Sequence, residues 1–81
     1  MYMNLEKLNA RDAFLITPAD SDLARSALAL YIGGAGNVRV TTIGGTDILF
    51  SGLPAGSYLN VQVKRVWSTN TSATLIAGLV Q

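Results

Sequence analysis

The sequence predicts an all-β fold, a small antiparallel β-sandwich or jelly-roll-like domain with an extended N-terminal arm. From residue 28 onward, runs of apolar, β-branched and aromatic residues are separated by glycine-rich segments at a spacing of about eight to twelve residues. Within these runs apolar and polar side chains alternate, which is typical of strands with one buried face. The 81 residues provide for one such domain, because a single core is already hard to fill at this length.

We expect five strands in this part of the chain. They cover residues 28–32, 38–43, 47–50, 58–67 and 73–80. The glycine-rich residues 33–37 predict a turn between the first two strands, and Gly44 with Gly45 predicts a two-residue hairpin turn. Residues 54–56 predict a further turn with a positive φ at Gly56. Residues with backbone freedom therefore mark each place where the chain is expected to reverse.

Alternation indicates which side chains face the core. Val38 and Val40 share one face of the second strand, opposite Arg39, so the valines are expected to be buried. The alternation of the fourth strand breaks at residues 65–66, which predicts a β-bulge or the edge of an interface. The last strand, residues 73–80, is nearly all apolar and is expected to be covered on both faces.

The N-terminal segment reads differently from the rest. We expect residues 1–12 to form an arm and residues 13–81 to form the single β-domain. A helical turn at residues 5–8 would be too short to be stable alone, so the arm is expected to order against another surface. Residues 13–17 predict a short strand. The stretch from Ser21 can be read as a loop or as a helical turn capped by that serine.

The composition predicts contact between subunits. Hydrophobic residues make up 49% of the chain and charged residues only 14%, whereas ordinary soluble domains carry about 25% charged residues. A chain of this size cannot hide that much apolar surface by itself, so a homo-oligomer is expected. A monomer kept in solution by its Ser, Thr, Asn and Gly residues is the open alternative. Without cysteine, packing alone must stabilise the fold.

Charge and hydropathy point to neither a polyanion nor a membrane. The formal net charge is +1, too weak to attract nucleic acid or an anionic bilayer by itself. The first ten residues include Glu6 and Lys7 and contain no apolar run of the length that a secretory signal needs. We therefore expect no membrane partner.

The residue types exclude most enzyme chemistry. The chain has no His and no Cys, which removes the common general base, the thiolate nucleophile and the usual transition-metal ligands. Residues 33–36 lack the third glycine and the following helix of a phosphate-binding loop. Residues 20–22 resemble part of a calcium loop but lack its glycine and its terminal Glu. We expect no enzymatic activity, no catalytic residue, no cofactor and no metal site.

Large side chains are the candidates for subunit contacts, because large aromatic residues carry most of the contact energy of protein interfaces. The candidate interface residues are Tyr31, Tyr58, Trp67 and Leu79.

The alternative is a small β-barrel module that binds single-stranded nucleic acid or glycan. Basic and aromatic side chains would form its binding face: Arg39, Lys64, Arg65, Phe50, Tyr58 and Trp67. Strict alternation places Trp67 on the inner side of its strand unless a bulge intervenes. This favours Trp67 as a core or interface residue over a nucleic-acid contact.

Several segments in a fixed order carry a resemblance to a known family. They are residues 29–40 (ALYIGGAGNVRV), Gly44-Gly45, residues 53–57 (LPAGS), residues 61–66 (VQVKRV) and residues 71–78 (TSATLIAG). Together with the upstream residues 17–22 (TPADSD), this pattern resembles the head-spike base family of gene-transfer agents and tailed phages. The resemblance covers residues 17–80, whereas residues 1–15 depart from the pattern.

The resemblance implies a capsid-attached virion protein. It implies a small β-structured subunit, made in the host cytoplasm, that assembles as a homo-oligomer on the capsid exterior. There it would connect the major capsid protein to a spike or fibre protein, and the arm would contact the shell or a neighbouring subunit. Trimeric decoration proteins of phage heads would have a similar composition, so a spike-base and a decoration role both stay open.

Overall fold

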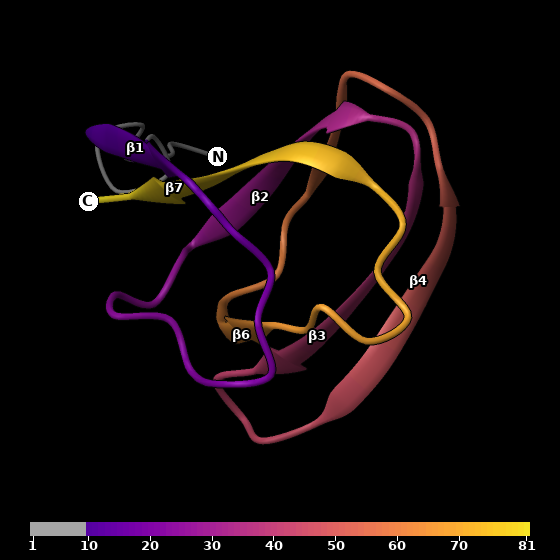
Figure 1. The fold of residues 1–81 in the computed structure, drawn as a ribbon. Helices are drawn as coiled ribbons and strands as arrows, with labels where there is room; N and C mark the ends of the chain where they lie inside the picture. Colours follow the sequence, from indigo (N-terminus) through magenta and orange to yellow (C-terminus); the bar gives the residue numbers. More distant parts are fainter. Residues whose placement is uncertain (1–9) are drawn as a thin grey trace, which may run out of the picture.

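The computed structural model describes residues 10–81, and these residues form strands, turns and loops without a helix (Figure 1). The strands are β1 (Asp12–Leu15), β2 (Ala29–Gly34), β3 (Gly36–Thr42), β4 (Asp47–Leu53), β5 (Ser57–Leu59), β6 (Val63–Val66) and β7 (Thr74–Val80). The part of the chain described here therefore has no helix that could cross a membrane. The helical turn predicted at residues 5–8 lies outside the described residues.

The strands form two antiparallel sheets, which confirms the predicted all-β sandwich. One sheet has four strands in the order β1-β7-β2-β5, and the other has three in the order β4-β3-β6. In Figure 1 the four-stranded sheet lies across the top, with β3, β4 and β6 below and to the right. The two sheets enclose the core between their inner faces.

The core consists of aliphatic side chains from both sheets. The largest fully buried side chains are Leu30, Ile32, Val38, Val40, Val63, Val66 and Ile76. Val38 and Val40 are buried as the alternation predicts, whereas Arg39 between them faces outward. No polar or charged residue of the described part is buried, so packing of apolar surface stabilises the fold.

The turn predicted at residues 33–37 is wrong. Only Ala35 separates β2 from β3, and the chain passes directly from the four-stranded sheet into the three-stranded sheet. Gly36 makes this passage with a φ of +154°. A Cβ atom on Gly36 would lie 2.6 Å from the backbone nitrogen of Ala73. The glycines therefore allow the chain to cross from one sheet to the other at a place where it passes close to the backbone of Ala73.

The single strand predicted at residues 58–67 is also wrong, because it consists of two strands in different sheets. β5 pairs with β2, and β6 pairs with β3. The predicted bulge is confirmed and lies at Lys64, because Thr41 pairs with Arg65 while Thr42 pairs with Val63. The extra residue turns Arg65 to the outer face of the sheet.

The turns between the remaining strands follow the sequence in part. Residues 43–46 join β3 to β4, so the expected two-residue turn is wrong, and Gly45 has a φ of +93° in the longer connection. The turn at residues 54–56 is confirmed, with a φ of +83° at Gly56. The Ser57 amide donates a hydrogen bond to the Pro54 carbonyl oxygen at 3.3 Å.

The N-terminal part of the described chain closes one edge of each sheet. β1 pairs with β7, slightly ahead of the strand predicted at residues 13–17. Residues 19–27 form a loop instead of a helical turn and run along β6. Along this edge the amides of Ala19 and Leu23 donate hydrogen bonds to carbonyl oxygens of β6. The outer edge of β6 is therefore occupied by the protein's own loop.

Candidate interaction surfaces

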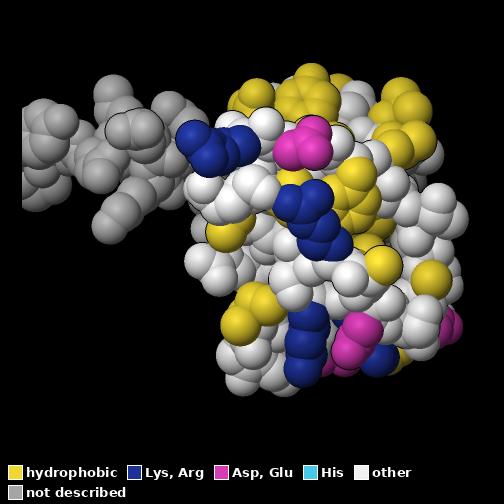
Figure 2. Space-filling view, turned by 90° about the vertical axis from the view of Figure 1, so that its left-hand side faces the viewer, with side chains coloured by type: hydrophobic (Ala, Val, Ile, Leu, Met, Phe, Trp, Pro, Cys, Tyr) yellow, Lys and Arg dark blue, Asp and Glu magenta, His cyan; other side chains and the backbone are white. Residues whose placement is uncertain are grey.

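The outer face of the four-stranded sheet is apolar. The residues that alternate with the buried ones on β1, β2, β5 and β7 are Ala13, Leu15, Ala29, Tyr31, Tyr58, Leu75, Ala77 and Leu79. We call this set the apolar face. Strand register aligns four of them in one row across the sheet, in the order Leu15, Ala77, Tyr31 and Tyr58. In Figure 2, hydrophobic side chains gather along the upper edge of the molecule.

Three large side chains of the apolar face stand out into solvent. Leu15 and Leu75 are each 69% exposed, and Tyr58 is 61% exposed. Tyr31 packs edge-to-face against Tyr58 with ring centroids 5.2 Å apart, a contact worth about 0.5–1.5 kcal/mol that holds the two rings in place. Leu79 is half-buried. The expected cover on the outer face of β7 is not provided by the described residues of this chain.

Leu75 has a backbone conformation that is rare for leucine. Its φ is +52°, and the left-handed region costs an L-residue about 1–2 kcal/mol. Gly33 of the neighbouring strand permits this conformation, because a Cβ there would lie 2.7 Å from the Leu75 carbonyl oxygen. This strained residue carries a large apolar side chain that the described residues leave exposed. Such local strain is found at functional sites.

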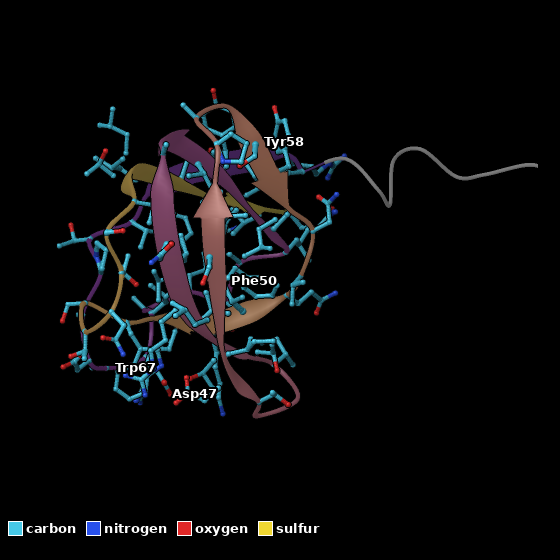
Figure 3. The ribbon with its side chains drawn as sticks, turned by 90° about the vertical axis from the view of Figure 1, so that its right-hand side faces the viewer. Asp47, Phe50, Tyr58 and Trp67 are labelled. Atoms are coloured by element: carbon cyan, nitrogen blue, oxygen red, sulfur yellow. The ribbon has the colours of Figure 1, made fainter. Side chains whose placement is uncertain are left out.

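Trp67 lies on the outer face of the other sheet. Its indole is placed between two guanidinium groups, with Arg39 Cζ 4.0 Å and Arg65 Cζ 4.6 Å from the ring centroid. Its Nε1 donates a hydrogen bond to Thr41 Oγ1 at 2.9 Å. Tyr58 and Trp67 lie at opposite ends of the molecule (Figure 3). The candidate interface residues therefore divide, with Tyr31, Tyr58 and Leu79 on the apolar face and Trp67 apart from them.

Both arginines at Trp67 have acidic partners. Arg39 binds Asp47 through two hydrogen bonds of 3.1 and 2.7 Å, and Arg65 Nη2 lies 2.9 Å from Asp22 Oδ1. The hydrogen bonds that Arg39 donates to the Asp47 carboxylate raise the pKa of Arg39 above its ordinary value. Ion pairs of this kind leave little net positive charge for a phosphate backbone.

The predicted nucleic-acid face comes together only in part, at Arg39, Arg65 and Trp67. Phe50 packs against the core of the sandwich, and Tyr58 belongs to the other sheet. Trp67 and Arg65 do share an outer face, because the bulge at Lys64 reverses the alternation. Without the other aromatic rings, this face has one stacking platform and two paired arginines.

Asp20 makes a contact that sequence reasoning missed. Its carboxylate accepts hydrogen bonds from the hydroxyls of Ser68 and Thr69, each at 2.9 Å, and from both of their backbone amides. The hydrogen bond from the Thr69 hydroxyl contributes most to lowering the pKa of Asp20 below its ordinary 3.8. Asp20 and Asp22, which resemble part of a calcium loop, are thus engaged with protein groups. Among residues 10–81, no three His, Cys, Asp or Glu side chains gather into a potential metal site.

The Asp20 contact predicts a specific pH dependence. Because folding lowers the pKa of Asp20, its contribution to stability is present above 3.8 and is lost as the pH falls through the folded value. We expect D20N to unfold at a lower denaturant concentration than the wild type at pH 7, and the difference between the two proteins to be smaller at pH 2. Urea unfolding at both pH values tests this expectation. A difference of equal size at both pH values would contradict it.

Comparisons with known proteins identify the class of this chain. No family model and no curated protein matches it. A chain in a solved structure described as the capsid of a native GTA particle, computed with C5 symmetry, matches with a TM-score of 0.80 and 32% sequence identity. The match covers 96% of this chain and 90% of that chain. The chain is therefore a structural protein of a virion head. It belongs to the capsid-associated proteins of gene transfer agents and phages.

Proposed function

We propose that this protein is a spike-base or decoration subunit on the exterior of the capsid, where it assembles as a homo-oligomer. In this role it binds the major capsid protein and connects the head to a spike or fibre protein. The observation that carries the proposal is the apolar face, whose exposed Leu15, Leu75 and Tyr58 are of the type that forms the centre of protein interfaces. The similarity to a chain of a GTA capsid supports a location on a virion head.

The charge distribution supports an exterior position. A subunit on the inner side of the shell would face packaged nucleic acid, and binding to a phosphate backbone requires Lys or Arg side chains whose charge is not already paired. This chain has a net charge of +1, and Arg39 and Arg65 are bound by acidic residues. A function by adhesion requires no catalytic group or cofactor, so we propose that the protein is not an enzyme.

The N-terminal arm, residues 1–12, is proposed to contact the shell or a neighbouring subunit. The Arg11 amide donates a hydrogen bond to the Val80 carbonyl oxygen at 2.8 Å, so the chain enters the domain at the end of β7. The arm therefore joins the domain at the outer strand of the four-stranded sheet, whose outer surface is the apolar face. In this proposal, residues 13–81 form the β-domain, and the arm attaches this domain to the shell or to a neighbouring subunit.

Reconstitution on heads tests the proposed function. Purified chain is added to heads that lack it and sedimented with them. We expect the chain to cosediment with the heads and to stay accessible to an antibody against a C-terminal tag, since Gln81 is exposed. Heads already saturated with the chain are the control and should bind no more. Failure to cosediment, or a tag that is accessible only after heads are opened, would contradict the proposal.

A further inference from the structure

The exposed large hydrophobic residues of the described chain fall into two separate groups. Leu15, Tyr58 and Leu75 belong to the apolar face. Ile43, Ile48 and Leu49, between 41% and 47% exposed, belong to the hairpin formed by β3 and β4, and we call these three residues the hairpin patch. Tyr58 and Asp47, the first residue of β4, lie at opposite ends of the molecule (Figure 3). Ile48 pairs with the buried Val40, whereas Leu49 pairs with the outward-facing Arg39, so the hairpin patch surrounds the open edge of β4 rather than lying on one face of its sheet. The apolar face and the hairpin patch are therefore two separate surfaces.

Neither surface presents an unpaired charge. The apolar face contains no ionisable group except the tyrosine hydroxyls, and it lies on a different sheet from Arg39 and Arg65. The charge closest in sequence to the hairpin patch is Asp47, whose carboxylate is bound by Arg39 at 2.7 Å. The two surfaces can therefore be buried against each other without removing an unpaired charge from water.

The edge of the hairpin patch is open as well. β4 is an edge strand of seven residues, DILFSGL, without proline or lysine. Natural proteins usually protect such edges, and here residues 19–27 protect the other edge of the same sheet. β1 and β5, the edge strands of the four-stranded sheet, are only four and three residues long. Of the edge strands described, β4 is the one that most needs a cover.

We propose that copies of this chain contact each other heterologously, with the apolar face of one copy packed on the hairpin patch of the next. This inference rests on the proposed homo-oligomer and names its interface. A contact of the apolar face with itself would leave the hairpin patch of both copies exposed, and the reverse holds for a contact between two hairpin patches. A heterologous contact covers both surfaces on each copy, and it continues from copy to copy until a ring closes or a filament forms.

Two residues are central to this interface. Leu75 is the strained leucine that stands out from the apolar face, and we assign it as the side chain inserted between copies. Leu49 lies opposite Arg39 on the outer face of its sheet, on the same side as the Trp67 ring. Trp67 then borders the contact without belonging to the apolar face. This gives all four candidate interface residues a place at or beside one heterologous interface.

Mixing of variants tests the arrangement directly. L75D disables the apolar face and L49D disables the hairpin patch, and aspartate tolerates the left-handed conformation at residue 75 better than leucine does. Each variant alone is expected to assemble at a concentration at least tenfold above that of the wild type. An equimolar mixture retains one intact pair of surfaces, so it should form a species of two chains. Native mass measurement at micromolar concentration distinguishes one chain of 8.5 kDa from two.

The controls separate assembly from folding and from attachment to heads. A24D adds a charge at an exposed residue of the loop before β2 and should assemble like the wild type. A second pair, Y58D and I43D, repeats the test if either first variant has a lowered thermal midpoint, since Ile43 is the most exposed residue of the hairpin patch. The inference is overturned if the wild type is monomeric, if L49D assembles normally, or if the mixtures form no two-chain species. Cosedimentation of the wild type with heads reports on the proposed function independently of these outcomes.

Discussion

Replacing Leu30 with alanine is expected to lower the free energy of unfolding by about 2–5 kcal/mol. Leu30 lies on β2, is 0% exposed, and pairs with Leu59 on one side and Gly78 on the other. The substitution leaves a cavity between the two sheets that the closed sandwich cannot fill. A domain of this length has a total stability of roughly 4–12 kcal/mol, so the loss is a large part of the whole. Urea unfolding followed by circular dichroism measures the change.

The matched control for Leu30→Ala is Leu30→Met. Methionine keeps the volume of the side chain and should cost less than about 1.5 kcal/mol. Both variants should be compared with the wild type at one protein concentration, because assembly adds to the apparent stability of an oligomer. Equal losses for alanine and methionine would show that the volume of Leu30 does not stabilise the core, contrary to the packing described above.

Most strands of this fold can be predicted from local sequence, but the strands with which they pair cannot. Alternation at Val38 and Val40 indicates β3 and its buried side correctly. The same alternation runs from residue 59 to residue 64 and gives no sign that the chain changes sheets after β5. That change depends on which strands offer hydrogen-bonding edges, and this is decided by the packing of distant segments. For the same reason, the order β1-β7-β2-β5 could not be predicted.

The candidate surfaces show the same division between local and distant information. Tyr31 and Leu79 each alternate with buried residues, so sequence predicts that they leave the core. Only the pairing of β2 with β7 and β5 brings them onto one face with Tyr58. The outward position of Trp67 depends on a bulge whose approximate place was predicted. The left-handed conformation of Leu75 depends on its close approach to Gly33, which no local pattern indicates.

The glycines between β2 and β3 show how a correct signal can be given the wrong interpretation. Backbone freedom at residues 33–37 predicts a chain reversal, because glycine clusters between strands usually form turns. The structure uses the same freedom to pass the chain from one sheet to the other, beside Ala73. Ser72 follows this crossing and accepts a hydrogen bond from the Asn37 amide at 2.9 Å. The requirement for glycine is therefore set by a neighbouring segment that lies 36 or more residues away in the chain.

This crossing leads to the second prediction, that Gly36→Ala prevents normal folding. A Cβ at residue 36 would lie 2.6 Å from the Ala73 nitrogen and 2.8 Å from its Cα, and both atoms belong to backbone that cannot rotate away. The φ of +154° adds strain for any residue with a side chain. Strain of about 1–3 kcal/mol and overpacking of about 1–3 kcal/mol together approach the stability of the domain.

Gly44→Ala is the matched control, because the same methyl group there meets only the Thr42 hydroxyl at 3.7 Å. Its free energy of unfolding, measured with urea, should be within about 1 kcal/mol of that of the wild type. Gly36→Ala should instead be recovered in the insoluble fraction or unfold at a much lower urea concentration. Because residue 36 connects the two sheets, misfolding of the Gly36→Ala protein would also disrupt the placement of the apolar face relative to the hairpin patch. A Gly36→Ala protein as stable as Gly44→Ala would show that the chain does not cross between the sheets at this position.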